Sequence, residues 1–344
     1  MTSVTWNCAA TCIGSLPHTD PAEAVSLILS EVRSIPFWPQ LPSRGFRENM
    51  YAQYSHILPG IIIDNENMKV QVDLENYDPE AFYMDVISEQ VERFEYSPDH
   101  FSGFYEFMER DLPEEAVAVK GQVTGPVSTG LQITDQTGKA AIYDEAYGEI
   151  VRKNLNMMAR WQERRLREKC GNTIIFLDEP YLSLMGTPFA SIKPHEVITW
   201  INEVIEGLEG TVAIHCCGNT DWPTVMATDI DILSFDAYDY GHTIGLYSDE
   251  VADFLENGGA LAWGLIPNDE EVFYKENINS LAQLGEKLIR SLEQKGIDLD
   301  LVVRNSLITP QCGLGGVQES ASADILRTLA GVSSVLSERF GLEG

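Results

Sequence analysis

Short runs of β-forming residues alternate with longer amphipathic segments along almost the whole chain of 344 residues. This alternation is typical of parallel strands that are connected by helices and lie in one sheet. The predicted strands are Ala9–Gly14, Phe37–Leu41, Val117–Val123, Ile174–Leu177, Val212–His215, Ile230–Phe235, Ala260–Leu265 and Val302–Ile308. The predicted helices are Pro21–Val32, Asp78–Glu95, Asp144–Lys169, Pro194–Glu206, Ser248–Glu256, Ile278–Gln294 and Ser320–Arg339. Eight strands with intervening helices predict an α/β fold of the (β/α)8 type, a TIM barrel.

The segment Ile61–Val72 interrupts this alternation. It reads as a small hairpin inserted after the second strand, with the polar run Asp64–Asn67 as its turn. The chain contains no linker rich in proline, glycine or serine and no internal repeat. We therefore expect residues 1–344 to form a single catalytic barrel domain.

The charge and the cysteine content exclude several classes of protein. The chain has 53 acidic and 23 basic residues, and nonspecific binding to nucleic acid requires clustered lysine and arginine instead. The acidic surface is either simply solvated or a docking face for a basic partner. No run approaches the roughly 18 apolar residues of a spanning helix, and Met1–Ala10 lacks the regions of a secretory signal. Without such segments, we expect no membrane contact. Six cysteines in a chain of this length do not indicate a disulfide framework, so we expect a cytoplasmic protein that keeps its thiols reduced.

Reactive side chains gather at the predicted carboxyl ends of the strands. In a barrel these ends converge on the active site. They carry Ile13, Gly14 and Ser15 after the first strand, Asp178 and Glu179 after the fourth, His215 and Cys217 after the fifth, Asp236 after the sixth, and Cys312 after the eighth. Most of these residues either carry a charge, can bind a metal ion, or are small enough to expose the backbone. We therefore expect the active site at this end of the barrel.

The stretch "IHCCGN" contains a candidate metal site. His215 and Cys217 are two residues apart, so in an extended chain both point to one face while Cys216 points to the other. A lone His-x-Cys in a strand more often packs in the core. Catalytic zinc, however, uses three nitrogen or sulfur ligands and keeps one exchangeable position. Cys312 is the natural third ligand, and Asp236 is a candidate for a weak fourth ligand that a substrate could displace.

Several motifs together resemble a known family. They are "IGSLP" (13–17), "VTGPV" (123–127), "FLDEP" (176–180), the "HCC" at 215–217 and "TPQCGLGG" (309–316). They are similar to the C-terminal catalytic barrel of cobalamin-independent methionine synthase, within the uroporphyrinogen decarboxylase-like superfamily. The resemblance covers nearly the whole chain.

The resemblance implies roles for individual residues. His215, Cys217 and Cys312 would bind zinc, and Asp236 would replace the family's glutamate ligand. Ile13, Gly14 and Ser15 would line the amino-acid site, and Asp178, with Glu179 beside it, would hold the substrate's amino group. The implied reaction is methyl transfer to a zinc-activated thiol, with homocysteine converted to methionine.

Two departures from the family pattern concern the methyl donor. The chain has no room for the family's duplicated N-terminal barrel, and Trp263–Asn268 lacks the acid-capable histidine expected after the seventh strand. A folate amine leaves poorly unless it is protonated, whereas low-valent cobalt leaves without a proton. We therefore favour a methylated corrinoid protein, or free methylcobalamin, over methyltetrahydrofolate. His242 is the candidate for a proton relay.

A third departure concerns the acceptor. Arg44 falls where the family has the glutamate that recognises the homocysteine amine, although Glu48 compensates if the alignment shifts. An arginine would repel an ammonium and suit a carboxylate or sulfonate. Coenzyme M, a thiol without an amine, is therefore the alternative acceptor. In a second interpretation, Arg44 only pairs with an acidic residue at the surface. Two other classes stay open, a metal-free decarboxylase of the tetrapyrrole type and a non-catalytic barrel with a structural zinc or a corrinoid-handling role.

Overall fold

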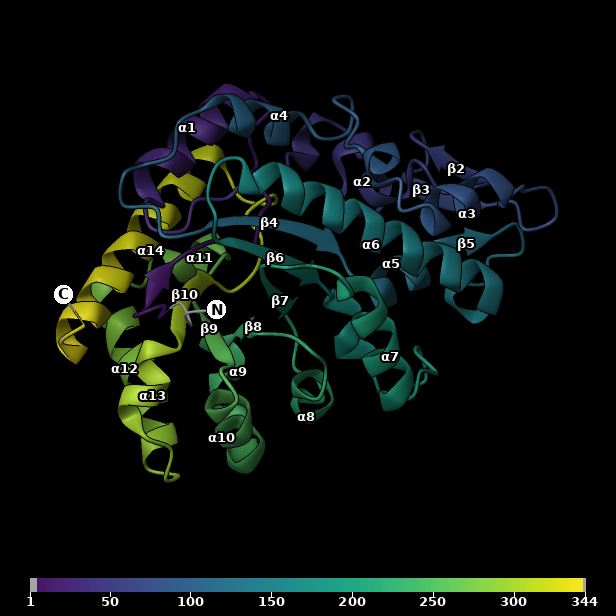
Figure 1. Ribbon diagram of the computed structural model, residues 1–344. Helices are drawn as coiled ribbons and strands as arrows, with labels where there is room; N and C mark the ends of the chain where they lie inside the picture. Colours follow the sequence, from purple (N-terminus) through teal and green to yellow (C-terminus); the bar gives the residue numbers. More distant parts are fainter. Residues whose placement is uncertain (1–4, 343–344) are drawn as a thin grey trace.

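A curled sheet of seven parallel strands forms the centre of the computed structural model, which describes residues 5–342 (Figure 1). The strand order is β1-β10-β9-β8-β7-β6-β4. The strands are β1 Ala9–Ala10, β4 Val119–Thr124, β6 Thr173–Asp178, β7 Thr211–Cys216, β8 Ile232–Asp236, β9 Ala260–Ile266 and β10 Ser306–Pro310. Almost every residue in them is buried, as expected for a parallel sheet covered on both faces. The predicted α/β fold with a parallel sheet is confirmed.

The long helices surround this sheet (Figure 1). Their ends lie within a residue or two of the predicted ones: α1 Pro21–Glu31, α6 Glu145–Arg167, α7 Pro194–Ile205, α10 Ser248–Glu256, α12 Ile278–Glu293 and α14 Glu319–Phe340. Side-chain caps explain several of the starts. Asp20 accepts from the Ala22 amide before α1, and Asp144 accepts from the Tyr147 amide before α6. None of the helices in the described residues is long and apolar enough to cross a membrane.

The predicted second strand, Phe37–Leu41, is wrong. This segment lies in the gap between β4 and β1, where Phe37 bridges Lys120 and Gln40 bridges Ser15, without forming a regular ladder. Pro36 and Pro39 have no N–H group to donate to a neighbouring strand. The main sheet therefore has seven strands, and an irregular segment occupies the place of the eighth.

Three other predicted boundaries also need correction. The first strand is only Ala9–Ala10, and the start of the predicted strand Val302–Ile308 belongs to helix α13, Leu299–Arg304. The Asp298 side chain caps α13 by accepting from the Leu301 amide. The predicted helix Asp78–Glu95 divides into α3, Glu80–Ile87, and a 3-10 turn at Val91–Phe94, because Glu89 has a left-handed backbone (φ 50°).

The predicted hairpin segment contains an antiparallel pair, β2 Ile61–Asp64 and β3 Lys69–Val72. Asp64 stabilises the turn by accepting from the amides of Glu66 and Asn67. A short strand, β5 Thr134–Asp135, pairs with β3 and extends the pair to a second sheet, which lies beyond one end of α6 (Figure 1). The remaining helices, none of them predicted, are short: α2 Met50–Ser55, α4 Ser102–Glu109, α5 Pro126–Gln132, α8 Trp222–Met226, α9 Ala237–Ile244 and α11 Glu270–Phe273.

Candidate metal and substrate site

The carboxyl ends of the strands surround a cavity of about 240 Å³. Its walls come from the end of β1, the segment before α2, and the ends of β6, β7 and β10. The lining residues are Ile13, Ser15, Gln40, Pro42, Glu48, Asn49, Met50, Asp178, Pro180, His215, Cys217, Cys312, Gly313, Gly315 and Gly316. Seven of the predicted site residues are therefore brought together: Ile13, Ser15, Glu48, Asp178, His215, Cys217 and Cys312.

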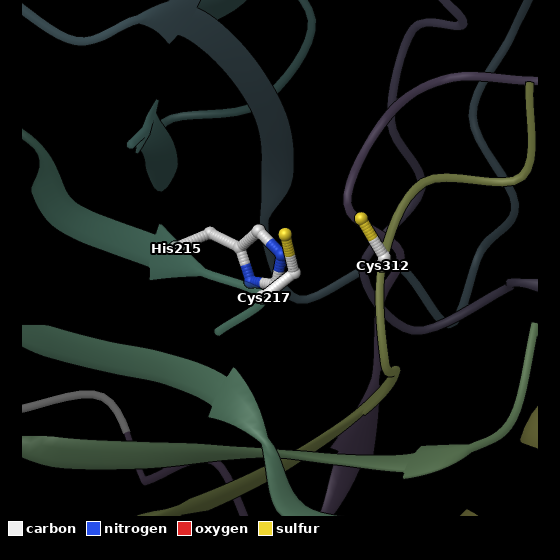
Figure 2. A group of neighbouring side chains, drawn as sticks. All are labelled: His215, Cys217 and Cys312. Carbon is white, nitrogen blue, oxygen red and sulfur yellow. The ribbon is translucent and has the colours of Figure 1, made fainter. Parts of the chain in front are cut away.

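Three of these residues place potential metal ligands close together. The ligand atoms of His215, Cys217 and Cys312 all lie within 4.8 Å of one another. His215 and Cys217 come from the end of β7, and Cys312 approaches from the separate segment after β10 (Figure 2). Cys216, between the first two, is buried in the hydrophobic core. The alternation of side chains along β7 thus separates the candidate ligands from the core cysteine, as the sequence predicts.

The ring of His215 is oriented by a neighbouring strand. His215 is paired with Ser234 in the β7–β8 register, and its Nδ1 lies 3.0 Å from Ser234 Oγ. Its other nitrogen, Nε2, is buried and has no hydrogen-bond partner. A buried polar atom without a partner requires an explanation. Together with two nearby sulfurs, this free nitrogen makes a donor set that fits zinc and leaves an exchangeable position.

The two cysteines are electrostatically coupled. The proximity of the Cys312 thiol and the His215 ring lowers the pKa of Cys217 below its usual value. The same pairing with Cys217, together with burial, raises the pKa of Cys312. Without a cation the pair therefore retains a proton, and binding of a metal would release it.

Asp178, at the end of β6, is a buried carboxylate in the cavity wall. Its Oδ1 has no hydrogen-bond partner. Burial raises the pKa of Asp178 to about 6, although the positive charges of Lys120 and His215 act in the opposite direction. An unpaired carboxylate oxygen in a cavity is suited to bind a cationic group such as an ammonium.

Glu48 lines the cavity and Arg44 does not. Arg44 Nε lies 2.6 Å from Glu48 Oε1, and Ser102 Oγ donates to the same oxygen at 2.7 Å. Burial raises the pKa of Glu48. Of the two alternatives left open by the sequence, the carboxylate faces the cavity, and the arginine supports it from a more exposed position.

Besides Arg44, two more predicted substrate residues, Gly14 and Glu179, lie outside the cavity lining. Gly14 packs against Gln122, so a Cβ added to Gly14 would lie 2.8 Å from Gln122 Cδ. The Glu179 carboxylate accepts from the amides of Val127 and Ser128, both at 2.8 Å, and fixes the start of α5. Gly14 and Glu179 therefore support the structure around the cavity and do not face the cavity themselves.

Asp236 and His242 are not brought into the metal-ligand group. The Asp236 carboxylate caps α9 by accepting from the Asp239 amide at 3.0 Å, and it also accepts from Gln311 Nε2 at 3.0 Å. These bonds hold the carboxylate beside the residue that precedes Cys312. His242 lies on α9 and lines a different groove, together with Leu246 and Lys287.

Several residues of this site were not predicted from the sequence. Ser234 is two positions before Asp236 in β8 and so shares its face, which was a usable signal. Gln311 precedes Cys312 and bonds Asp236, but nothing in the sequence indicates that contact. The buried Lys120 on β4 was also missed, although it lies among the residues that position the cavity wall.

The fold is similar to those of solved methionine synthases and a methyltransferase. A B12-independent methionine synthase from Shewanella sp. W3-18-1, solved in complex with selenomethionine, is similar with a TM-score of 0.63 and 16% identity over 98% of this chain and 99% of that one. A methyltransferase from Methanosarcina mazei has a TM-score of 0.57 and 12% identity, covering 99% and 95% of the two chains. A putative B12-independent methionine synthase from Listeria monocytogenes has a TM-score of 0.56 and 13% identity, covering 95% and 97%. No protein-family model and no curated protein matches the chain.

Proposed function

We propose that this protein is a zinc-dependent methyltransferase that transfers a methyl group to a thiol sulfur, within a single catalytic domain of residues 1–344. Homocysteine is the proposed acceptor and methionine the product. One observation carries the proposal: His215, Cys217 and Cys312 place three donor atoms within 4.8 Å of one another in a cavity that also contains buried carboxylates. The similarity in fold to methionine synthases and a methyltransferase supports the same class.

In this proposal the zinc ion is held by His215, Cys217 and Cys312. A bound zinc ion would lower the pKa of the acceptor thiol and keep its sulfur as a nucleophilic thiolate. The chain contributes the orientation of His215 through Ser234, and two half-buried sulfur ligands in the cavity wall. A structural site would require a fourth strong ligand, and Asp236 is already engaged with α9 and Gln311.

The cavity wall favours an amino-thiol as acceptor. Asp178 has a free carboxylate oxygen, and Glu48 lines the same cavity. Two carboxylates suit the ammonium of homocysteine and disfavour the sulfonate of coenzyme M. Coenzyme M is therefore the second candidate acceptor.

The donor is proposed to be a methylated corrinoid, either free or bound to a partner protein. Among the described residues that line the cavity, His215 is the sole imidazole, and it belongs to the ligand set. Asn268, at the end of β9, donates to the Gly313 carbonyl at 3.3 Å and supplies no acid. A folate amine needs protonation to leave, and a corrinoid does not.

Cobalt(II) substitution tests the proposal most directly. Cys217 and Cys312 should already give a thiolate-to-cobalt charge-transfer band, and we expect homocysteine to intensify and shift this band and coenzyme M to change it less or not at all. A protein that purifies without metal, or a spectrum that neither thiol changes, would refute the thiol methyltransferase. Methylcobalamin and methyltetrahydrofolate are then compared as donors, and turnover only with the folate would refute the corrinoid assignment. A metal-free decarboxylase would be indifferent to chelators.

A further inference from the structure

Lys120 is a buried cation for which the proposed reaction has no direct use. It lies on β4 and has no exposed surface. Its Nζ donates to the Ile13 carbonyl and, at 2.9 Å, to Gln122 Oε1, and it lies 4.5 Å from the centre of the Phe176 ring. Burial lowers the pKa of Lys120 to about 8. A methionine would fill similar volume without the cost of burying an ammonium, so the charge calls for a reason beyond packing.

The position of Lys120, beside the irregular segment between β4 and β1, supplies a reason for the buried charge. The proline-containing segment between β4 and β1 prevents a continuous ladder at this point. The Lys120 amide donates to the Pro36 carbonyl at 2.9 Å, on the near side of the gap. Its side chain reaches the Ile13 carbonyl, on the far side. Lys120 thus connects β4 directly to the segment that follows β1.

That segment contributes Ile13 and Ser15 to the cavity wall, and the carbonyl groups of residues 13–15 all accept hydrogen bonds. The Ile13 carbonyl accepts from Lys120, the Gly14 carbonyl from the Gln40 amide at 3.0 Å, and the Ser15 carbonyl from the Leu314 amide at 2.9 Å. The last two contacts are between neutral backbone groups. A charged donor makes a stronger hydrogen bond than a neutral one, so Lys120 is the strongest of the three attachments.

We infer that Lys120 is a positioning residue for the acceptor thiol: it holds Ile13, and with it the adjoining Ser15, at the cavity wall. This inference rests on the proposed function. Its consequence is that loss of the ammonium weakens acceptor binding and leaves the metal ligands in place, because no described contact joins Lys120 to His215, Cys217 or Cys312.

The test is Lys120→Met, which removes the charge and both hydrogen bonds at similar volume. We expect KM for homocysteine to rise by about tenfold or more, as for the loss of a hydrogen bond to a charged group. Zinc content should be unchanged and kcat should change by less than about threefold, which separates binding from chemistry. Lys169→Met is the matched control, since Lys169 Nζ also donates to a backbone carbonyl, that of Met108 at 3.2 Å, but does not line the cavity. A folded, zinc-loaded Lys120→Met enzyme with the wild-type KM would overturn the inference.

Gln122→Met keeps the test decisive if Lys120→Met does not fold. Gln122 accepts from Lys120, donates to the Trp38 carbonyl at 3.2 Å and packs against Gly14. Its loss should raise KM for homocysteine by a few fold, and an unchanged KM would count against Lys120 as well. Wild-type enzyme assayed in parallel separates the two levels of failure. If the wild type does not bind the thiol, the proposed function fails; if the wild type binds it and the variants bind equally well, only the inference fails.

Discussion

His215 Nδ1 and Ser234 Oγ lie 3.0 Å apart across the register of β7 and β8. This contact leaves His215 Nε2 as the nitrogen that faces the two cysteines, buried and without a partner. The hydroxyl of Ser234 thus selects which nitrogen is available to a metal. Metal affinity should therefore depend on a residue that does not itself bind the ion.

Ser234→Ala should lower the affinity for zinc by roughly 10- to 100-fold, the range observed when a hydrogen-bond partner of a ligating histidine is removed. Competition with a chromophoric chelator measures this affinity. Ser306→Ala, in the neighbouring part of the sheet, is the matched control, because Ser306 is a buried strand serine whose hydroxyl donates to the Val302 carbonyl. Equal affinities in the two variants would contradict the proposed role of Ser234.

Cys312→Ser should reduce the zinc content from about one ion per chain to a small fraction of that, because soft thiolate donors dominate zinc binding at such sites. Elemental analysis of dialysed protein gives the stoichiometry. Cys170→Ser controls for the loss of a thiol elsewhere, since Cys170 lies outside the ligand group. Full zinc occupancy in Cys312→Ser would rule out the assigned ligand set.

Glu48→Gln should raise KM for homocysteine by roughly 10- to 100-fold, because the substrate ammonium loses a charged partner in the cavity. An acceptor without an amino group, such as coenzyme M, should lose no affinity. Glu106→Gln is the matched control: Glu106 pairs with Arg110 at 2.6 Å with the same i,i+4 spacing as Arg44 and Glu48, but lies outside the cavity. If Glu48→Gln weakened both thiols equally, the carboxylate would be structural rather than selective.

A stacked pair of histidines should make stability depend on pH. The rings of His56 and His100 lie 4.4 Å apart, and burial lowers the pKa of both, that of His100 from 6.5 to about 4. Between these two values the unfolded chain binds more protons than the folded one, so stability falls as the pH falls from about 6.5 towards about 4.

His100→Phe should make this loss shallower, because it keeps a stacked ring and removes a titrating group. Urea unfolding between about pH 7 and pH 5 measures the slope. His195→Gln, at an exposed position in α7, should keep the wild-type slope. A wild-type slope in His100→Phe would show that the acid sensitivity originates elsewhere.

Much of the fold could be predicted because its signals are local. Helix α10 begins and ends where its periodicity predicts, and α6 begins after a capping aspartate. The errors occur where contacts distant in sequence decide the outcome. Phe37–Leu41 has the composition of a strand, but Pro36 and Pro39 prevent the ladder, and the short helices α5 and α9 have too few residues for a clear periodicity.

The candidate site divides in the same way. Residue spacing alone places His215 and Cys217 on one face of β7 and Cys216 on the other, because side chains alternate along a strand. Cys312, which the sequence also predicts as the third ligand, lies beside them. Only the tertiary structure decided that Asp236 is held at α9, that Glu48 rather than Arg44 lines the cavity, and that Lys120 reaches Ile13. These outcomes depend on how strand ends far apart in the chain meet in space, and a side chain's local sequence carries no information about which distant group lies within hydrogen-bonding reach.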